Sequence, residues 1–191
     1  MIDAESDTKK YIDILSTVDD GRDTSKIINW LTKSDFFTAP ASTRFHLSEY
    51  GGLCHHSLNV YTRLRDIDSL MGIGIDRNSI VICGLLHDIC KANFYETEKR
   101  NRKVNDKWEE YDAYTVNDKF PIGHGEKSVI IIQKYMELKA EEALAIRWHM
   151  GAYNMNFQDT QSLSNANKIH PLVLAMQMAD QTASFWDEEG E

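Results

Sequence analysis

Four histidines and two aspartates recur along the chain at similar intervals. They are His56, His87, Asp88, His124, His149 and Asp180. Apart from the adjacent pair, successive members are about 25 to 36 residues apart, which suits one helix plus one connection each. In an antiparallel bundle, this spacing lets successive helices bring one ligand each to a common level, and metal sites in helical folds are commonly built in this way.

The surroundings of these residues predict that several of them are buried. His87 and Asp88 directly follow the apolar run from Ile82 to Leu86. Burying a carboxylate beside an imidazole costs several kcal/mol unless something compensates for it. Asp180 likewise follows the apolar stretch "PLVLAMQMA".

Helical periodicity separates the two neighbouring histidines, His55 and His56. His56 shares a helix face with an apolar stripe, whereas His55 shares a face with polar residues. The stripe consists of Val60, Leu64, Ile67 and Met71. We therefore expect His56 to point inward and His55 to point toward solvent or the edge of a cleft.

A shared divalent ion, or a pair of ions, would offset the cost of burying all six groups at once. Taken singly, an inward histidine is more often a hydrogen-bonded core residue, and an aspartate near a helix end is usually solvated. Taken together, the imidazole lone pairs and the carboxylate charges favour a metal centre. Histidine and aspartate ligands suit Fe, Mn, Co, Ni or Zn better than Ca or Mg alone.

The elements that would carry these groups are mostly helical. Only 3 prolines and 10 glycines interrupt 191 residues, which favours long helices over many short strands. Residues 94–118 lack helical periodicity and contain a turn-like "VNDK", which predicts a small β-hairpin. The polar stretch 153–168 is expected to be a loop. Helices are expected at about 8–18, 23–33, 53–70, 78–90 (capped by Asn78 or Ser79), 124–136, 139–150 and 171–186.

Length and composition predict one soluble domain spanning residues 1–191, with its core at about 51–186. The chain has 21 Lys and Arg against 30 Asp and Glu, a formal net charge of -9, so long nucleic acids are disfavoured partners. No stretch is apolar enough to span a bilayer, so no membrane association is expected. The N-terminus does not resemble a signal peptide, and three unpaired cysteines suit a reducing compartment, so a cytoplasmic location is expected.

Five segments that contain these residues resemble the HD-domain metal-dependent phosphohydrolase superfamily. "GGLCHHSLNV", "LLHDICK" and "QMADQTAS" resemble its ligand helices, while "GHGEKS" and "RWHMG" resemble the extra histidines of its six-ligand, two-metal branch. The resemblance covers about residues 51–184. It implies an all-α fold, an HD-domain helical bundle, with the small β-hairpin as an insertion.

The resemblance also implies roles for individual residues. One divalent ion would bind His56, His87, Asp88 and Asp180, and a second would bind His124 and His149 with Asp88 as a bridge. Asp88 and Lys91 would then be the catalytic residues, with Lys91 holding a phosphate oxygen or an oxygen intermediate. A lysine at the end of a helix that interacts with the helix dipole is an equal alternative for Lys91. Structural or surface roles are favoured for Arg44, His46, Glu126, Lys127 and Arg147.

Three functions are compatible with this pattern. The first is a phosphohydrolase, a phosphomonoesterase or phosphodiesterase, that acts on a nucleotide or another small phosphorylated substrate through a hydroxide activated by two metals. The second is a mixed-valent diiron oxygenase similar to myo-inositol oxygenase, which shares the ligand set. The third is a metal-stabilised binding module without catalytic activity. We rank the binding module third, because His124 and His149 complete a second metal site that a purely structural role does not need.

Overall fold

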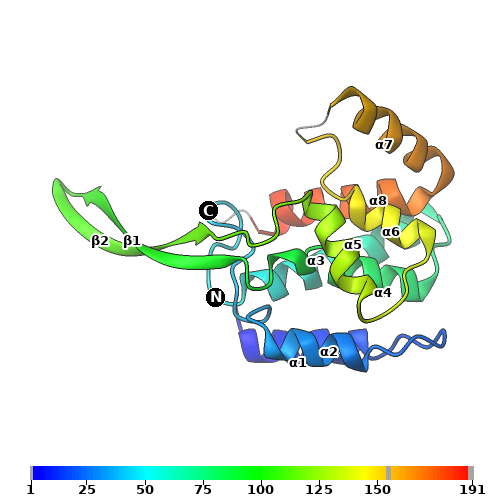
Figure 1. Ribbon diagram of the computed structural model, residues 1–191, viewed down its shortest axis with the longest axis horizontal. Helices are drawn as coiled ribbons and strands as arrows, with labels where there is room; N and C mark the ends of the chain where they lie inside the picture. The colour runs from blue at the N-terminus through cyan, green and yellow to red at the C-terminus, as the bar shows by residue number, and fades with distance from the viewer. Residues whose placement is uncertain (1, 154–155, 189–191) are drawn as a thin grey trace.

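The computed structural model describes residues 2–153 and 156–188, and these residues form a helical body with one projecting β-hairpin (Figure 1). The all-α fold and the hairpin that the sequence predicts are both confirmed. The α-helices are α1 (Ala4–Leu15), α2 (Ser25–Lys33), α3 (Gly52–Met71), α4 (Arg77–Leu86), α5 (His124–Gln133), α6 (Ala140–Arg147), α7 (Phe157–Ile169) and α8 (Pro171–Thr182). A 3₁₀ turn (Ile89–Lys91) follows α4, strands β1 (Tyr95–Val104) and β2 (Lys107–Val116) form the hairpin, and a π-helix (Ala183–Asp187) follows α8.

The long helix α3 lies at the centre of the helical body. It packs against α1, α4 and α8, while α6 packs against α4, α5 and α8. Every residue of α4 from Asn78 to Leu86 is buried, which explains why the part from Ile80 to Leu86 is apolar on every side. The helices that carry the predicted ligands are therefore direct neighbours in the core.

Two glycines allow these helices to approach closely. A Cβ atom on Gly84 of α4 would lie 2.6 Å from the Cα of Tyr61 in α3. A Cβ atom on Gly125 of α5 would lie 2.3 Å from the carbonyl oxygen of Arg147 in α6. Both contacts are too short for any side chain, so glycine sets the spacing of the α3–α4 and α5–α6 pairs.

The hairpin extends away from the helices as a two-stranded antiparallel ribbon (Figure 1). Its register runs from the pair Tyr95 and Val116 at the base to the pair Val104 and Lys107 at the tip. Asn105 and Asp106 form the turn with φ angles of 49° and 62°, as expected for a two-residue hairpin turn. Most of its side chains are exposed, so the helical core owes little of its stability to the ribbon.

The structure corrects the prediction that residues 153–168 form a polar loop. Residues 154 and 155 lie outside the described part of the chain, but Phe157–Ile169 form helix α7. The Asn156 side chain accepts a hydrogen bond from the Asp159 backbone and caps the helix, and Leu163 and Ala166 are buried. Two buried residues give too weak an apolar period to reveal a helix in the sequence.

Aspartate caps also shift two helix starts. Asp3 accepts a hydrogen bond from the backbone of Ser6, so α1 begins at Ala4 rather than near residue 8. Asp76 caps α4 in the same way, instead of the predicted Asn78 or Ser79. The same α-helix ends at Leu86, not at residue 90, and the chain tightens into the 3₁₀ turn that follows.

Within the described residues, no helix combines the length and the apolar character needed to cross a lipid bilayer.

Candidate metal centre

The structure brings all six predicted ligands together in the interior of the helical body. Each helix that supplies one carries it near an end, where α3, α4, α5, α6 and α8 meet. His56 lies in α3, His87 and Asp88 directly follow α4, His124 opens α5, His149 follows α6 and Asp180 lies in the last turn of α8. The rings of His56, His87, His149 and His124 follow one another at centroid distances of 5.0 to 5.3 Å.

Five of these six residues are buried, and the sixth lies at the rim. His87 and His149 are fully inaccessible, whereas the His124 side chain is 31% exposed. The cluster is therefore shielded from solvent on most sides and accessible from the side of His124.

Hydrogen bonds at the outer ring nitrogens fix which nitrogen faces the interior. The Nδ1 atom of His87 lies 3.0 Å from the carbonyl oxygen of Gly84, and the Nδ1 atom of His149 lies 2.7 Å from that of Ile146. Because a carbonyl oxygen only accepts, each Nδ1 carries a proton and donates it. In the neutral ring, the Nε2 lone pair then points into the cluster, as a metal ligand requires.

The inner nitrogens have the arrangement expected around a cation. The Nε2 atoms of His56 and His87 are 3.2 Å apart, and the Nε2 atom of His56 is also 3.2 Å from the Asp180 carboxylate. The Nε2 atom of His149 is buried without a hydrogen-bond partner among the described residues. Facing lone pairs and an orphaned buried nitrogen are costly unless a proton or a metal ion lies between them. The residues present therefore fit a divalent metal.

The two carboxylate oxygens of Asp88 face different histidines. Its Oδ2 atom lies 3.7 Å from Nε2 of His56 and 3.6 Å from Nε2 of His87. Its Oδ1 atom lies 2.5 Å from Nε2 of His124 and 3.4 Å from Nε2 of His149. Asp88 thus stands between two pairs of imidazoles, with one oxygen toward each pair.

The family to which the chain belongs agrees with this geometry. The family described as HD domain matches residues 53–184, which is most of the chain and includes all six groups. The chain belongs to the HD-domain family. HD domains bind divalent metals and are generally metal-dependent hydrolases, as the resemblance implied. No curated protein and no solved structure matches the chain significantly.

Burial and charge act in opposite directions on the histidines of this HD domain. Burial alone lowers the pKa of His56, but hydrogen bonds to Asp180 and Glu188 raise it to about 10. Burial lowers the pKa of His87 to about 3, because the nearby carboxylates do not offset it. One imidazole of the facing pair thus favours the charged form and the other the neutral form.

Asp88 stays ionised despite its position in the core. Burial raises its pKa, but the positive charge of Lys91 and the neighbouring histidines hold that pKa well below its usual range. An ionised carboxylate in this position is a ready ligand for a cation.

Lys91 points toward the cluster rather than along a helix axis. In a 3₁₀ turn, side chains three residues apart lie on the same side, which brings Lys91 over Asp88. The Lys91 Nζ atom is 2.7 Å from Oδ2 of Asp88 and donates a second hydrogen bond, also 2.7 Å, to the carbonyl oxygen of Ala41. The structure therefore places this lysine beside the candidate centre, and its catalytic role stays a prediction.

Cys90 and His124 extend the cluster at its rim. Asp88, Cys90 and His124 form one of the described groups whose ligand atoms lie close enough to hold an ion. The Cys90 sulfur is 3.3 Å from Nδ1 and 3.7 Å from Nε2 of His124. The shorter of the two contacts places the sulfur within hydrogen-bonding distance of Nδ1. Burial raises the Cys90 pKa to about 12, so it remains a thiol beside the imidazole.

The other polar residues considered from the sequence mostly make structural contacts. Arg147 pairs with Glu126 and stacks on the ring of Trp148, and Lys127 pairs with Asp118. Arg44 lies over the ring of Phe45. His46 is different, because its ring lies 5.0 Å from that of His56, next to the centre. His55, as expected, points outward, where it pairs with Asp7.

Sequence reasoning missed two residues behind His56: Glu188, which contacts its ring, and Asn59, which binds Glu188. Glu188 lies 2.9 Å from Nδ1 of His56 and accepts a hydrogen bond from Asn59. Glu188 belongs to an acidic segment that is typical of solvated chain, and Asn59 falls on the polar face of α3, so no sequence signal distinguished either residue.

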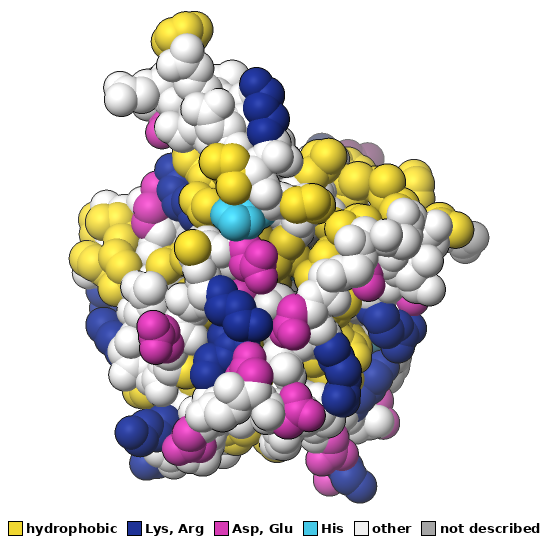
Figure 2. Space-filling view, turned by 90° about the vertical axis from the view of Figure 1, so that its right-hand side faces the viewer, with side chains coloured by type: hydrophobic (Ala, Val, Ile, Leu, Met, Phe, Trp, Pro, Cys, Tyr) yellow, Lys and Arg dark blue, Asp and Glu magenta, His cyan; other side chains and the backbone are white. Residues whose placement is uncertain are grey.

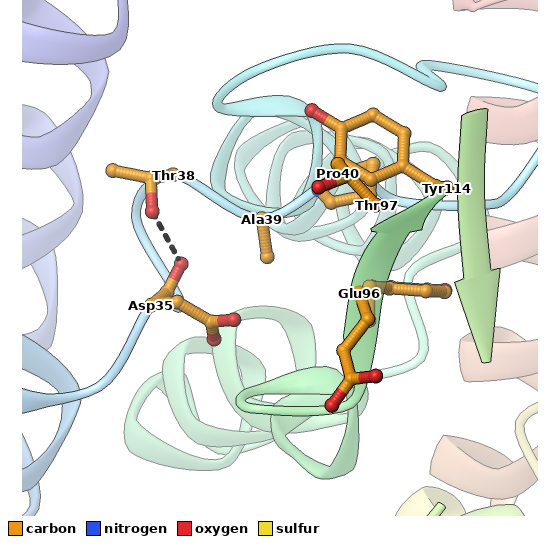
Figure 3. A pocket seen from close by; sticks show the side chains of 8 residues that line it. Asp35, Thr38, Ala39, Pro40, Glu96, Thr97 and Tyr114 are labelled. Carbon is orange, nitrogen blue, oxygen red and sulfur yellow. Dashed lines mark hydrogen bonds between the residues drawn. The ribbon is translucent and has the colours of Figure 1, made fainter. Parts of the chain in front are cut away.

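A cavity of about 430 Å³ lies beside the base of the hairpin and contains none of the six candidate ligands. Figure 3 shows its side chains, which come from the loop after α2 and from the two strands. The lining residues are Asp35, Thr38, Ala39, Pro40, Tyr95, Glu96, Thr97 and Tyr114. The Tyr95 hydroxyl donates to the Ala41 carbonyl oxygen, which also accepts from Lys91, so the cavity wall adjoins the candidate centre.

Proposed function

We propose that this HD-domain protein is a phosphohydrolase that acts on a nucleotide or another small phosphorylated substrate with the help of two divalent ions. The observation that carries the proposal is the position of Asp88, which turns one oxygen toward His56 and His87 and the other toward His124 and His149. A carboxylate between two sets of imidazoles is suited to bridge two cations.

The six groups divide between two cations on this proposal. His56, His87 and Asp180 would hold one ion and His124 and His149 the other, with Asp88 shared. When bound, such ions lower the pKa of a coordinated water and neutralise charge on a phosphoryl group. The metal candidates remain Fe, Mn, Co, Ni and Zn, which suit mixed imidazole and carboxylate ligands.

On this proposal, residues of the protein orient the ligands and the substrate. The Nδ1 donors of His87 and His149 are fixed by backbone carbonyls, so these two rings cannot turn when the substrate binds. Lys91 supplies a positive charge beside Asp88, where it would attract a phosphoryl oxygen of the substrate. The exposed edge of His124 leaves room for a substrate to enter from that side.

The overall charge favours a small substrate. The net charge of -9 opposes the approach of long polyanions, whereas a small phosphate ester is attracted by the local cations of the centre. Cleavage of short oligonucleotides is compatible with this charge, but processive decay of long RNA is not favoured.

An activity panel tests the proposal. Protein purified without chelator is loaded with Mn²⁺, Co²⁺, Ni²⁺ or Fe²⁺ and incubated with nucleoside mono-, di- and triphosphates, cyclic nucleotides and generic phosphoesters. We expect release of phosphate or nucleoside from at least one of them. The variant Asp88→Ala, purified in parallel, should lose metal and activity together, which separates this activity from that of a contaminating phosphatase.

Two results would contradict the proposal. One is a metal-loaded protein that cleaves none of these compounds. The other is oxygen uptake that depends on a reduced iron centre, which would instead identify a diiron oxygenase.

A further inference from the structure

The carboxylate of Glu188 is buried directly behind the candidate metal centre. Its side chain is fully inaccessible to solvent, and its two oxygens lie 3.0 and 2.9 Å from Nδ1 of His56. The amide of Asn59, one turn further along α3, donates a 2.9 Å hydrogen bond to the same carboxylate. Both oxygens are therefore directed at one face of α3.

The ion-pair partners of this buried carboxylate are histidines. Within the described part of the chain, its ion-pair partners are the imidazoles of His56 and His46, the latter at 3.9 Å, and no lysine or arginine pairs with it. An ionised group without a fixed counter-charge is expensive to bury. An imidazole that is protonated or bound to a cation would provide that counter-charge. A metal ion bound to His56 would therefore stabilise the buried charge of Glu188.

His56 differs in this respect from the other two inward histidines. His87 and His149 donate their Nδ1 protons to the neutral carbonyl oxygens of Gly84 and Ile146. His56 alone among these three donates to a carboxylate. A carboxylate behind a metal-ligating histidine fixes its tautomer and orientation and raises its basicity.

We propose that Glu188 is a positioning residue that acts through the Nδ1–H of His56 and directs the Nε2 lone pair of that ring toward the metal. This inference rests on the metal binding contained in the proposed function. It extends the centre beyond the HD-domain match, which ends at residue 184, to a residue on the segment after α8.

The local fold explains how Glu188 reaches His56. Helix α8 continues into the π-helix Ala183–Asp187, whose wider turn displaces the residue that follows it. The neighbouring carboxylate, Asp187, forms a two-pronged ion pair with Arg63 on the outer side of α3. Asp187 and Glu188 are thus adjacent acidic residues that both bind side chains of α3, but only Glu188 contacts His56.

This difference provides a matched pair of variants. Glu188→Gln keeps the size of the side chain and removes its charge, and Asp187→Asn does the same one residue earlier. The affinity of the metal-free protein for Co²⁺ is measured by calorimetry for both variants and for the wild type. We expect Glu188→Gln to weaken Co²⁺ binding about 10- to 100-fold, and Asp187→Asn to leave the affinity unchanged.

A spectroscopic readout separates positioning from mere support of the fold. In Zn²⁺-loaded protein, nitrogen NMR of the histidine side chains reports the hydrogen bond at Nδ1 of each ring. In Glu188→Gln, the His56 Nδ1 resonance should move, while those of His87 and His149 stay in place. Circular dichroism of the metal-free proteins checks that all variants are folded.

The possible results divide clearly. Unchanged Co²⁺ affinity in a folded Glu188→Gln protein, or an equal loss in Asp187→Asn, would overturn the inference and leave the proposed function intact. A wild-type protein that binds no Co²⁺ would overturn both. If Glu188→Gln does not fold, Asn59→Ala decides instead, because loosening the carboxylate should weaken Co²⁺ binding in the same direction, and unchanged affinity would refute the inference.

Discussion

At the scale of single residues, the centre depends on which ring nitrogen each histidine turns inward. The backbone carbonyls of Gly84 and Ile146 bind the outer nitrogens of His87 and His149, so their inner nitrogens are left as lone pairs. Asp88 carries the opposite charge to a bound cation and stays ionised because Lys91 and the histidines lower its pKa. His87 and His149 thus each have a hydrogen-bond partner at the outer nitrogen and a lone pair at the inner one, and Asp88 adds a negative charge.

Lys91 provides a prediction at this scale. In Lys91→Gln, metal binding should be retained, because the lysine is not a ligand and its removal takes away a positive charge near the cations. The rate of phosphate ester hydrolysis should fall about 100-fold or more, as when a donor to a developing negative charge is lost. Metal analysis and steady-state kinetics of the same preparation measure both quantities.

The matched control is Lys9→Gln, at an exposed position on α1. It should leave both the metal content and the rate as in the wild type. A Lys91→Gln enzyme with the wild-type rate would show that this lysine only neutralises Asp88 and takes no part in the reaction.

At the scale of elements, the ligands come from the ends of five helices, so the packing of those helices determines the geometry of the centre. One connection that fixes this packing is the buried Glu142 on α6. Arg22, in the loop after α1, donates two hydrogen bonds to its carboxylate, and Ser79 of α4 donates another. This network connects the loop after α1 and helix α4 to α6, the helix that His149 follows.

Breaking that network should destabilise the whole fold. Arg22→Ala leaves the fully buried carboxylate of Glu142 without its cation, so we expect the free energy of unfolding to fall by about 3 kcal/mol or more. Arg65→Ala removes an exposed ion pair with Asp66 and should cost less than about 1 kcal/mol. Chemical unfolding in urea measures both values, and equal effects of the two substitutions would contradict this account of the network.

The hairpin should be separable from the fold. Replacing residues 98–113 by a short glycine-containing turn removes mostly exposed side chains and keeps the base, where Tyr95 pairs with Val116. We expect the shortened protein to retain its helical circular dichroism and its metal content. A shortened protein that is unfolded or free of metal would show that the ribbon supports the core.

How much the sequence predicted differs between elements. The stripe that contains His56 follows a strict helical period, so the sequence predicted both α3 and the direction of His56. Helix α7 was missed because a cap at Asn156 and contacts with α8, rather than a continuous apolar face, stabilise it. The contact of Glu188 with His56 could not be predicted, because it depends on a π-helix. This local geometry is rare, and no residue pattern indicates it.

At the scale of the whole molecule, charge and metal binding set the expected behaviour in solution. Lys and Arg side chains are interspersed with Asp and Glu on the face drawn in Figure 2, so this face offers no continuous basic surface. Midway along the hairpin, basic residues of β1 face acidic residues of β2, as in the ion pair of Lys99 and Asp112. On the proposal of a small substrate, we expect neither surface to bind a long nucleic acid.

Metal removal should destabilise the molecule as a whole. A ligand that binds only the folded state adds about 2.7 kcal/mol at a free concentration of 100 times its Kd. We therefore expect a chelator to lower the melting temperature by several degrees, and added Mn²⁺ or Co²⁺ to restore it. Calorimetric scans of wild-type and Asp88→Ala protein measure this, and a chelator effect of equal size in both would contradict a specific centre.

The most direct test of the central claim is anomalous diffraction from crystals soaked in Co²⁺ or Mn²⁺, recorded on both sides of the metal absorption edge. The account predicts two peaks about 3.5 to 4 Å apart on either side of Asp88, one bound by His56, His87 and Asp180 and the other by His124 and His149. Soaked crystals with no anomalous peak among these six residues would contradict it.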